Sequence, residues 1–361
     1  MLKWSCYNIE TYALEEYMNR RISKTLGLSQ EAYLFDSPLY LTKSLLAIAT
    51  GYIIGKQFPI AQLDMISVLL GVMYNLEPLN RTGVRSGVSQ LIASTIGAAA
   101  TGILVLAFGV NVFSISIGMV LTLYVCLKIN WRLVSPVAIF TSIYMTQYIQ
   151  VNEAGLPSIW LTFRLRIIAL GLGVLIALFY NYIFSNLYYR KFAKKRLQYA
   201  NEQVLNGLIY TAKVFQRTLP RGKRGYIQLF SQQMNDLDLV YSNIEALKTE
   251  FTILKKEVKL KEVNKLQEIA ELYRDINHLT YDLNVLLEST PDVVLDKELE
   301  LSLEEVIVVL ESTDYTNSIV PPLHDLKVEK HYLDIGNPFA ERIHKICEKV
   351  NLVLEKLQHL R

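Results

Sequence analysis

The sequence predicts an all-α fold: six transmembrane helices, arranged as an inverted repeat of three helices plus three, followed by a cytosolic helical bundle. Three observations predict it. The chain of 361 residues is 51% hydrophobic, with a mean hydropathy of +0.23, which is higher than soluble globular chains usually show. Its uncharged runs reach the roughly 20 residues that a helix needs to cross a bilayer. A motif of small residues also recurs in two of these runs.

The candidate spans lie between residues 38 and 189. Ser86 to Leu127 carries no charged side chain and is long enough for two spans. The other four runs are Pro38 to Gly55 with only Lys43, Gln57 to Leu76 with only Asp64, Leu133 to Asn152, and Ile167 to Tyr189. A soluble protein with buried helices rarely aligns so many runs of membrane length, so a multi-pass membrane protein is favoured.

The segment 1–37 is expected to be cytosolic or interfacial. It is polar and mixed in charge, unlike a secretory signal, so the spans themselves are expected to direct insertion. Ile9, Tyr12 and Met18 suit a short interfacial helix that ends before Ser37 and Pro38, which together form an N-terminal signature for span one.

Loop charges predict the orientation of the spans, because Lys and Arg favour cytoplasmic loops. They gather in alternate segments: before span one (Arg20, Arg21, Lys24), between spans two and three (Arg81, Arg85), between four and five (Lys128, Arg132), and after span six (Arg190, Lys191, Lys194, Lys195, Arg196). Both termini are therefore expected in the cytoplasm. Arg164 and Arg166 are exceptions at the outer mouth of span six, where an arginine can also snorkel to the interface.

The repeated motif links the third span to the sixth. An offset of 76 residues sets Gln90 on Arg166, and it also superposes two pairs of small residues, Ala93 on Ala169 and Gly97 on Gly173. Two copies of three spans must insert with opposite orientations, and several transporters are built this way with a binding site at the repeat interface. Small residues at this spacing also serve plain helix packing in lipid.

Few polar side chains fall inside the spans, and ionisable groups at membrane depth are candidates for function. Asp64 is expected in the first turn of span two, where a helix N-terminus favours a carboxylate. We also predict that Asp64 pairs with Arg166, whose planar guanidinium can bind a carboxylate through two hydrogen bonds.

Three stretches carry a resemblance to a known family: YLTKSLLAIATGYIIG at 40–55, RSGVSQLIASTIGAA at 85–99, and LTFRLRIIALGLGVLIALFYNYIF at 161–184. They resemble the bacterial aromatic acid exporter family of the fusaric acid resistance superfamily. The resemblance covers about residues 38 to 196. It implies a multi-pass protein of the bacterial cell membrane that exports small aromatic carboxylates with coupling to the proton gradient.

The match is unequal between the two copies. Span one has the family's Tyr and Lys-Ser, as Tyr40, Lys43 and Ser44. In span three the family carries an Arg, a Gly-Thr pair and a Gly, whereas this chain has Gln90, Ala93 and Ser94 and keeps only Gly97. Arg85 is the candidate substitute for the missing arginine. The second copy keeps Arg166, Gly173 and Asn181, so the candidate substrate-binding residues are Arg166, Asp64, Gln90, Arg85 and Asn181.

Residues 190–361 predict a cytosolic domain of amphipathic helices. The expected helices are Leu197 to Leu219, Tyr226 to Thr290, Glu298 to Ser312 and Pro338 to Leu360. Their lengths favour a four-helix hairpin arrangement, packed on itself or against a second copy of the chain as a homo-oligomer. The basic cluster from Arg190 to Arg196 suits anionic lipid head groups at the end of span six.

Several functions are disfavoured. The tail is net acidic, so no nucleic-acid partner is expected. No phosphate loop, zinc spacing or serine elbow appears, so neither an enzyme nor a cofactor is expected. Cys6, Cys126 and Cys347 form no disulfide framework, and His344 with Cys347 suits a helix face better than a metal site.

Two functions stay open. In the first, the six spans transport a small organic anion through the bilayer, with a site at the repeat interface. In the second, the protein is a membrane scaffold or sensor that does not transport and acts through its cytosolic domain. Pairing of carboxylates and arginines across the repeats would favour transport, whereas a large exposed apolar surface on the tail would favour the scaffold.

Overall fold

The computed structural model describes residues 38–77, 79–129, 136–152, 154–219, 223–290, 296–322, 326–329, 331–332 and 336–358. The segment 1–37, expected to hold an interfacial helix, lies outside these ranges. Within them the named elements are all helices, accompanied by two isolated β-bridges, Val151 with Pro157 and Asp314 with Ile319. The all-α prediction is confirmed.

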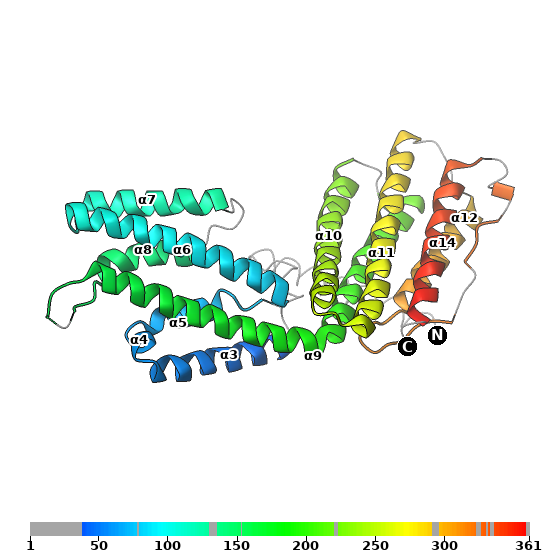
Figure 1. The fold of residues 1–361 in the computed structure, drawn as a ribbon. Coiled ribbons are helices and arrows are strands. Elements are labelled where there is room, and N and C mark those ends of the chain that lie inside the picture. Colours follow the sequence, from blue (N-terminus) through cyan, green and yellow to red (C-terminus); the bar gives the residue numbers. More distant parts are fainter. Residues whose placement is uncertain are drawn as a thin grey trace, which may run out of the picture.

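The helices form two bundles that share one long helix (Figure 1). The N-terminal bundle contains α3 (Pro38–Gln57), α4 (Pro59–Gln62), α5 (Met65–Met73), α6 (Asn80–Phe108), α7 (Val112–Ile129), α8 (Pro136–Gln147) and the first part of α9 (Ile159–Phe215). Helices α6 and α9 pack on one another at its centre; α7 and α8 pack on α6, while α3 and α5 pack on α9.

Within the described residues, α6 and α9 are the two helices long and apolar enough to cross a membrane. Large apolar side chains also point outward on this bundle, as shown by Leu45 (68% exposed), Leu106 (70%) and Leu175 (64%). Exposed apolar surface on this scale is typical of a face that contacts lipid or another protein.

The second expected span is not one continuous helix, so that part of the prediction is wrong. The run from Gln57 to Leu76 is broken between α4 and α5, where Leu63 and Asp64 form a turn. Asp64 is the N-cap of α5, and its side chain accepts a hydrogen bond from the backbone N–H of Ser67 at 3.2 Å. A carboxylate in this position satisfies an N–H group that would otherwise lack a partner, which stabilises a new helix start at this break.

Helix α9 covers 57 residues and is kinked at Tyr188, where its backbone leaves helical geometry (φ −116°, ψ 16°), one residue before the expected boundary at residue 189. The helix expected to begin at Leu197 is therefore the continuation of the last apolar helix. Arg196 also departs from expectation: it is buried, with its guanidinium carbon 3.2 Å from the centre of the Phe192 ring, and burial lowers its pKa. It therefore does not face lipid head groups.

The C-terminal bundle consists of the second part of α9 with α10 (Lys223–Ile253), α11 (Glu257–Ser289), α12 (Lys297–Glu311) and α14 (Pro338–Gln358). The expected single run from Tyr226 to Thr290 is two helices, because the chain turns between Leu254 and Lys256, with Lys255 at a positive φ of 52°. Apolar side chains from all five segments form one large core, which includes Phe251, Ile276 and Leu303.

Candidate functional site

A buried group of polar side chains lies in the N-terminal bundle at the end far from the C-terminal bundle. It consists of Asp64 and Ser67 at the start of α5, Tyr144 of α8, and Arg166 of α9. We call it the tail-distal cluster. The predicted pairing is present: a terminal nitrogen of Arg166 lies 3.5 Å from Asp64 Oδ1, and both side chains are only 1% exposed.

Asp64, Ser67 and Tyr144 surround the Arg166 guanidinium. The same nitrogen donates a hydrogen bond to the Ser67 hydroxyl, which in turn donates to Asp64. The ring of Tyr144 covers the guanidinium, with its centre 4.4 Å from the central carbon, a favourable arrangement for a cation. The Nε atom of Arg166 has no hydrogen-bond partner. A buried arginine with one unused N–H group can donate a hydrogen bond to a further oxygen atom.

A second buried polar group lies nearer the C-terminal bundle. It consists of Lys43 of α3, Asn75 and Glu77 after α5, Gln90 of α6, and Asn181 of α9, and we call it the tail-proximal cluster. Eight residues separate Ser67 from Asn75, so the two clusters lie about 12 Å apart along α5, at 1.5 Å per helical residue.

Hydrogen bonds connect the members of the tail-proximal cluster. Lys43 Nζ donates to Asn181 Oδ1 at 3.0 Å and to the backbone carbonyl of Glu77 at 2.5 Å. Asn181 donates to the carbonyl of Asn75 at 2.7 Å, and Asn75 donates to Gln90 Oε1 at 2.5 Å. Gln90 Nε2 and Asn75 Oδ1 are buried without a partner.

The structure divides the expected binding residues. Asp64 and Arg166 lie in the tail-distal cluster, whereas Gln90 and Asn181 lie in the tail-proximal one. Arg85 belongs to neither, because its side chain is exposed on α6. Arg85 therefore lies outside both clusters, and Gln90, at the position where the family carries an arginine, supplies an amide to the tail-proximal cluster.

The small residues of the repeat are all buried at helix contacts. Ala93 packs with Ala138 of α8, and Ala169 packs with Ala61 and Val68. A methyl group on Gly173 would come within 2.1 Å of the Val68 carbonyl oxygen, and one on Gly97 within 2.5 Å of Thr122. Gly173 therefore allows the backbones of α9 and α5 to touch, and Gly97 leaves room on α6 for the Thr122 side chain of α7.

Three participants were not singled out from the sequence: Ser67, Tyr144 and Asn75. Ser67 follows Asp64 by three residues, which is a usual spacing for a helix N-cap, so that signal was available. Tyr144 and Asn75 carry no comparable signal, because a tyrosine or an asparagine at the edge of an apolar run is common. In the described part of the chain, no three His, Cys, Asp or Glu side chains gather to hold a metal ion.

Comparison with models of known protein families and with curated protein sequences gave no match for this chain.

Proposed function

We propose that the N-terminal bundle is a six-span membrane domain that exports small organic carboxylates, aromatic ones above all. The observation that carries this proposal is the buried Arg166 with its single carboxylate partner, Asp64. An arginine this deep in an apolar bundle is expensive, and proteins retain such groups mainly where an anion or a proton must pass.

The inverted repeat of three helices plus three is part of the proposal, and the packing of the helices supports it. Helix α5 packs on α9 as α8 packs on α6, and α3 packs on α9 as α7 packs on α6. The contact of Ala93 with Ala138 has its counterpart in that of Ala169 with Ala61. Opposite orientation of the copies also fits the positions of Gln90 and Arg166, which align in sequence and lie in different polar clusters, about 12 Å apart along the bundle.

The chemistry of the tail-distal cluster suits exchange of carboxylates. Arg166 binds Asp64 in the structure, and a substrate carboxylate competes for the same guanidinium. The substrate carboxylate thus displaces Asp64 from Arg166, and coupling of export to the proton gradient is part of the proposal. The ring of Tyr144 lies where an aromatic substrate could stack on the same cation.

Two features distinguish a transporter from a scaffold: charge pairing across the repeats and the apolar surface of the C-terminal bundle. Both favour transport. Asp64 belongs to the first proposed repeat and Arg166 to the second, so the ion pair joins the repeats. The C-terminal bundle exposes few large apolar side chains, Ile253 and Val258 of the α10–α11 turn being the most prominent. A scaffold or sensor that acts through this bundle remains the alternative, and absence of transport would favour it.

The test is efflux of benzoate from proteoliposomes that hold the purified chain, with and without a proton gradient. We expect Arg166→Gln to abolish efflux and the exposed neighbour Arg164→Gln to retain it. Loss of a buried ion-pair partner can also unfold a protein, so Arg166→Lys, which keeps the charge but not the planar fork, is measured beside it. Full efflux in a folded Arg166→Gln variant would refute the proposal.

A further inference from the structure

A cleft of about 250 Å³ lies in the C-terminal bundle between α9 and α11, and the turn after α12 closes it. We call it the α9–α11 cleft. Its lining includes the polar side chains of Arg190, Lys194 and Glu262 and the apolar side chains of Leu266, Ile319 and Val320. In the proposed orientation it opens on the cytoplasmic side, close to the end of the last span.

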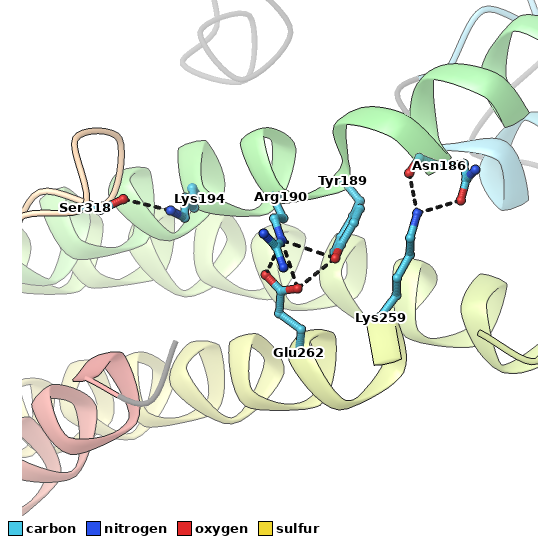
Figure 2. A network of polar contacts seen from close by, with 7 residues as sticks. All are labelled: Asn186, Tyr189, Arg190, Lys194, Lys259, Glu262 and Ser318. Carbon is cyan, nitrogen blue, oxygen red and sulfur yellow. Dashed lines mark hydrogen bonds and ion pairs between the residues drawn. The ribbon is translucent and has the colours of Figure 1, made fainter. Parts of the chain in front are cut away.

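The carboxylates that line the cleft already have donors. Glu262 accepts a hydrogen bond from the Tyr189 hydroxyl at 2.7 Å and pairs with Arg190 Nε at 2.8 Å (Figure 2). Asp314 accepts hydrogen bonds from the Thr316 hydroxyl and from Asn317, which lower its pKa to about 2. Neither anion therefore needs a cation from the cleft's occupant.

The cations are less completely satisfied. Lys194 Nζ donates to the neutral hydroxyl of Ser318 at 2.8 Å (Figure 2), and no described carboxylate pairs with it. Arg190 uses Nε for Glu262, while its side chain is 65% exposed, so its terminal nitrogens can bind a further group. The formal charges of Arg190, Lys194, Glu262 and Asp314 cancel, but the groups left to bind a ligand are the N–H donors of Lys194 and Arg190.

We propose that the α9–α11 cleft binds a small carboxylate with an apolar body. The carboxylate contacts Lys194 and the terminal nitrogens of Arg190, and the body packs on Leu266, Ile319 and Val320. The volume of the cleft limits the size of its ligand, because about 250 Å³ is less than the roughly 300–1,000 Å³ of sites for drug-sized ligands. A single-ring aromatic acid fits this smaller space, and a whole phospholipid does not.

The position of the cleft gives it a regulatory role, which rests on the proposed export function. Helix α11 holds α9 on both sides of the irregular residue Tyr188. Before it, Lys259 donates to the carbonyl and side-chain oxygens of Asn186 at 2.7 and 2.9 Å; after it, Glu262 holds Arg190 (Figure 2). A carboxylate bound to the terminal nitrogens of Arg190 attracts its guanidinium toward the cleft and thereby weakens the contact of Nε with Glu262. Cytosolic substrate thereby acts on the helix that carries Arg166.

The experiment is equilibrium dialysis of labelled benzoate against the full chain in detergent micelles, which gives both the number of sites and their affinity. We expect Lys194→Gln to weaken one site at least tenfold. Ile319→Glu, which adds a negative charge on a partly exposed wall, should do the same. The exposed neighbour Lys191→Gln should bind as wild type does. Benzamide, which has the same shape without the charge, should bind at least tenfold more weakly.

The outcomes separate this site from the proposed export site. Unchanged benzoate binding in both Lys194→Gln and Ile319→Glu would overturn the cleft proposal, even if proteoliposomes transport benzoate through Arg166. Binding that depends on Lys194 and persists in Arg166→Lys would support the cleft, even if no transport is found. A rate of efflux that rises with cytosolic benzoate in wild type, and not in Lys194→Gln, would support the regulatory role.

Discussion

The two bundles are built in opposite ways. In the N-terminal bundle the helices meet through small residues such as Gly173 and Ala93, the interior holds Arg166 and Lys43, and the outside carries large apolar side chains. In the C-terminal bundle large apolar side chains such as Phe251 fill the core and charged ones cover the surface. The first arrangement suits surroundings of lipid, where close packing joins helices; the second suits water, where burial of apolar area does.

The largest effect is expected from truncating a large side chain in the C-terminal core. Phe251 is fully buried and lies edge-on to the ring of Tyr189, with the ring centres 5.1 Å apart. Phe251→Ala should lower the free energy of unfolding by about 4 kcal/mol, because it leaves a cavity. Thermal and denaturant unfolding of the chain in detergent measure the change. Ile253→Ala, at an exposed site two residues away, should cost little; equal losses would contradict a C-terminal core that is stabilised by burial of large apolar side chains.

In the N-terminal bundle the damaging change is an added atom. Gly173→Ala places a methyl group against the Val68 carbonyl, so α5 and α9 must separate. Overpacking of this kind should cost about 3 kcal/mol. Gly171→Ala is the matched control, since nothing lies within 4 Å of the methyl group that it adds. The melting temperatures of the two variants in the same detergent give the comparison, and identical values would refute close contact at Gly173.

A smaller effect is expected at a buried hydrogen-bond network of the C-terminal core. The Tyr273 hydroxyl donates to Asn201 at 3.0 Å and lies 2.7 Å from the Tyr315 hydroxyl. Tyr273→Phe leaves two buried polar groups without a partner and should cost about 1–3 kcal/mol. Tyr332→Phe removes an exposed hydrogen bond to Asp296, which water replaces. Denaturant midpoints of both variants test this, and a loss as large in Tyr332→Phe would show that burial is not the cause.

The smallest effect is expected from chemical labelling of the buried Cys347 thiol. Burial raises the pKa of the Cys347 thiol to about 12, so at pH 8 the group is a thiol and hardly any of it is the reactive thiolate. In a variant with Cys6 and Cys126 replaced by serine, iodoacetamide at pH 8 should label the chain only after unfolding. Mass spectrometry measures the labelling. Rapid labelling of the folded chain would mean that the α14 face of the core opens readily.

Local sequence patterns predicted much of the fold and part of the site. Uncharged runs and helical periodicity identified the helical segments, because each depends on residues close in the chain. The pairing of Asp64 with Arg166 was also predicted, since few charges were available inside the apolar runs. The break at Asp64 and the turn at Lys255 were missed, because each interrupts a pattern that reads as continuous helix.

The sequence by itself determined which segments are helical, which of them are apolar, and which few polar residues must find partners inside the N-terminal bundle. Only the tertiary structure decided that these residues form two clusters, that Arg85 stays outside them, and that Tyr144 and Asn75 belong to them. The physical reason is distance along the chain. Helix formation is a local property, whereas Arg166 meets Ser67 across 99 residues and Lys43 meets Asn181 across 138, and only the packing of helices brings such pairs together.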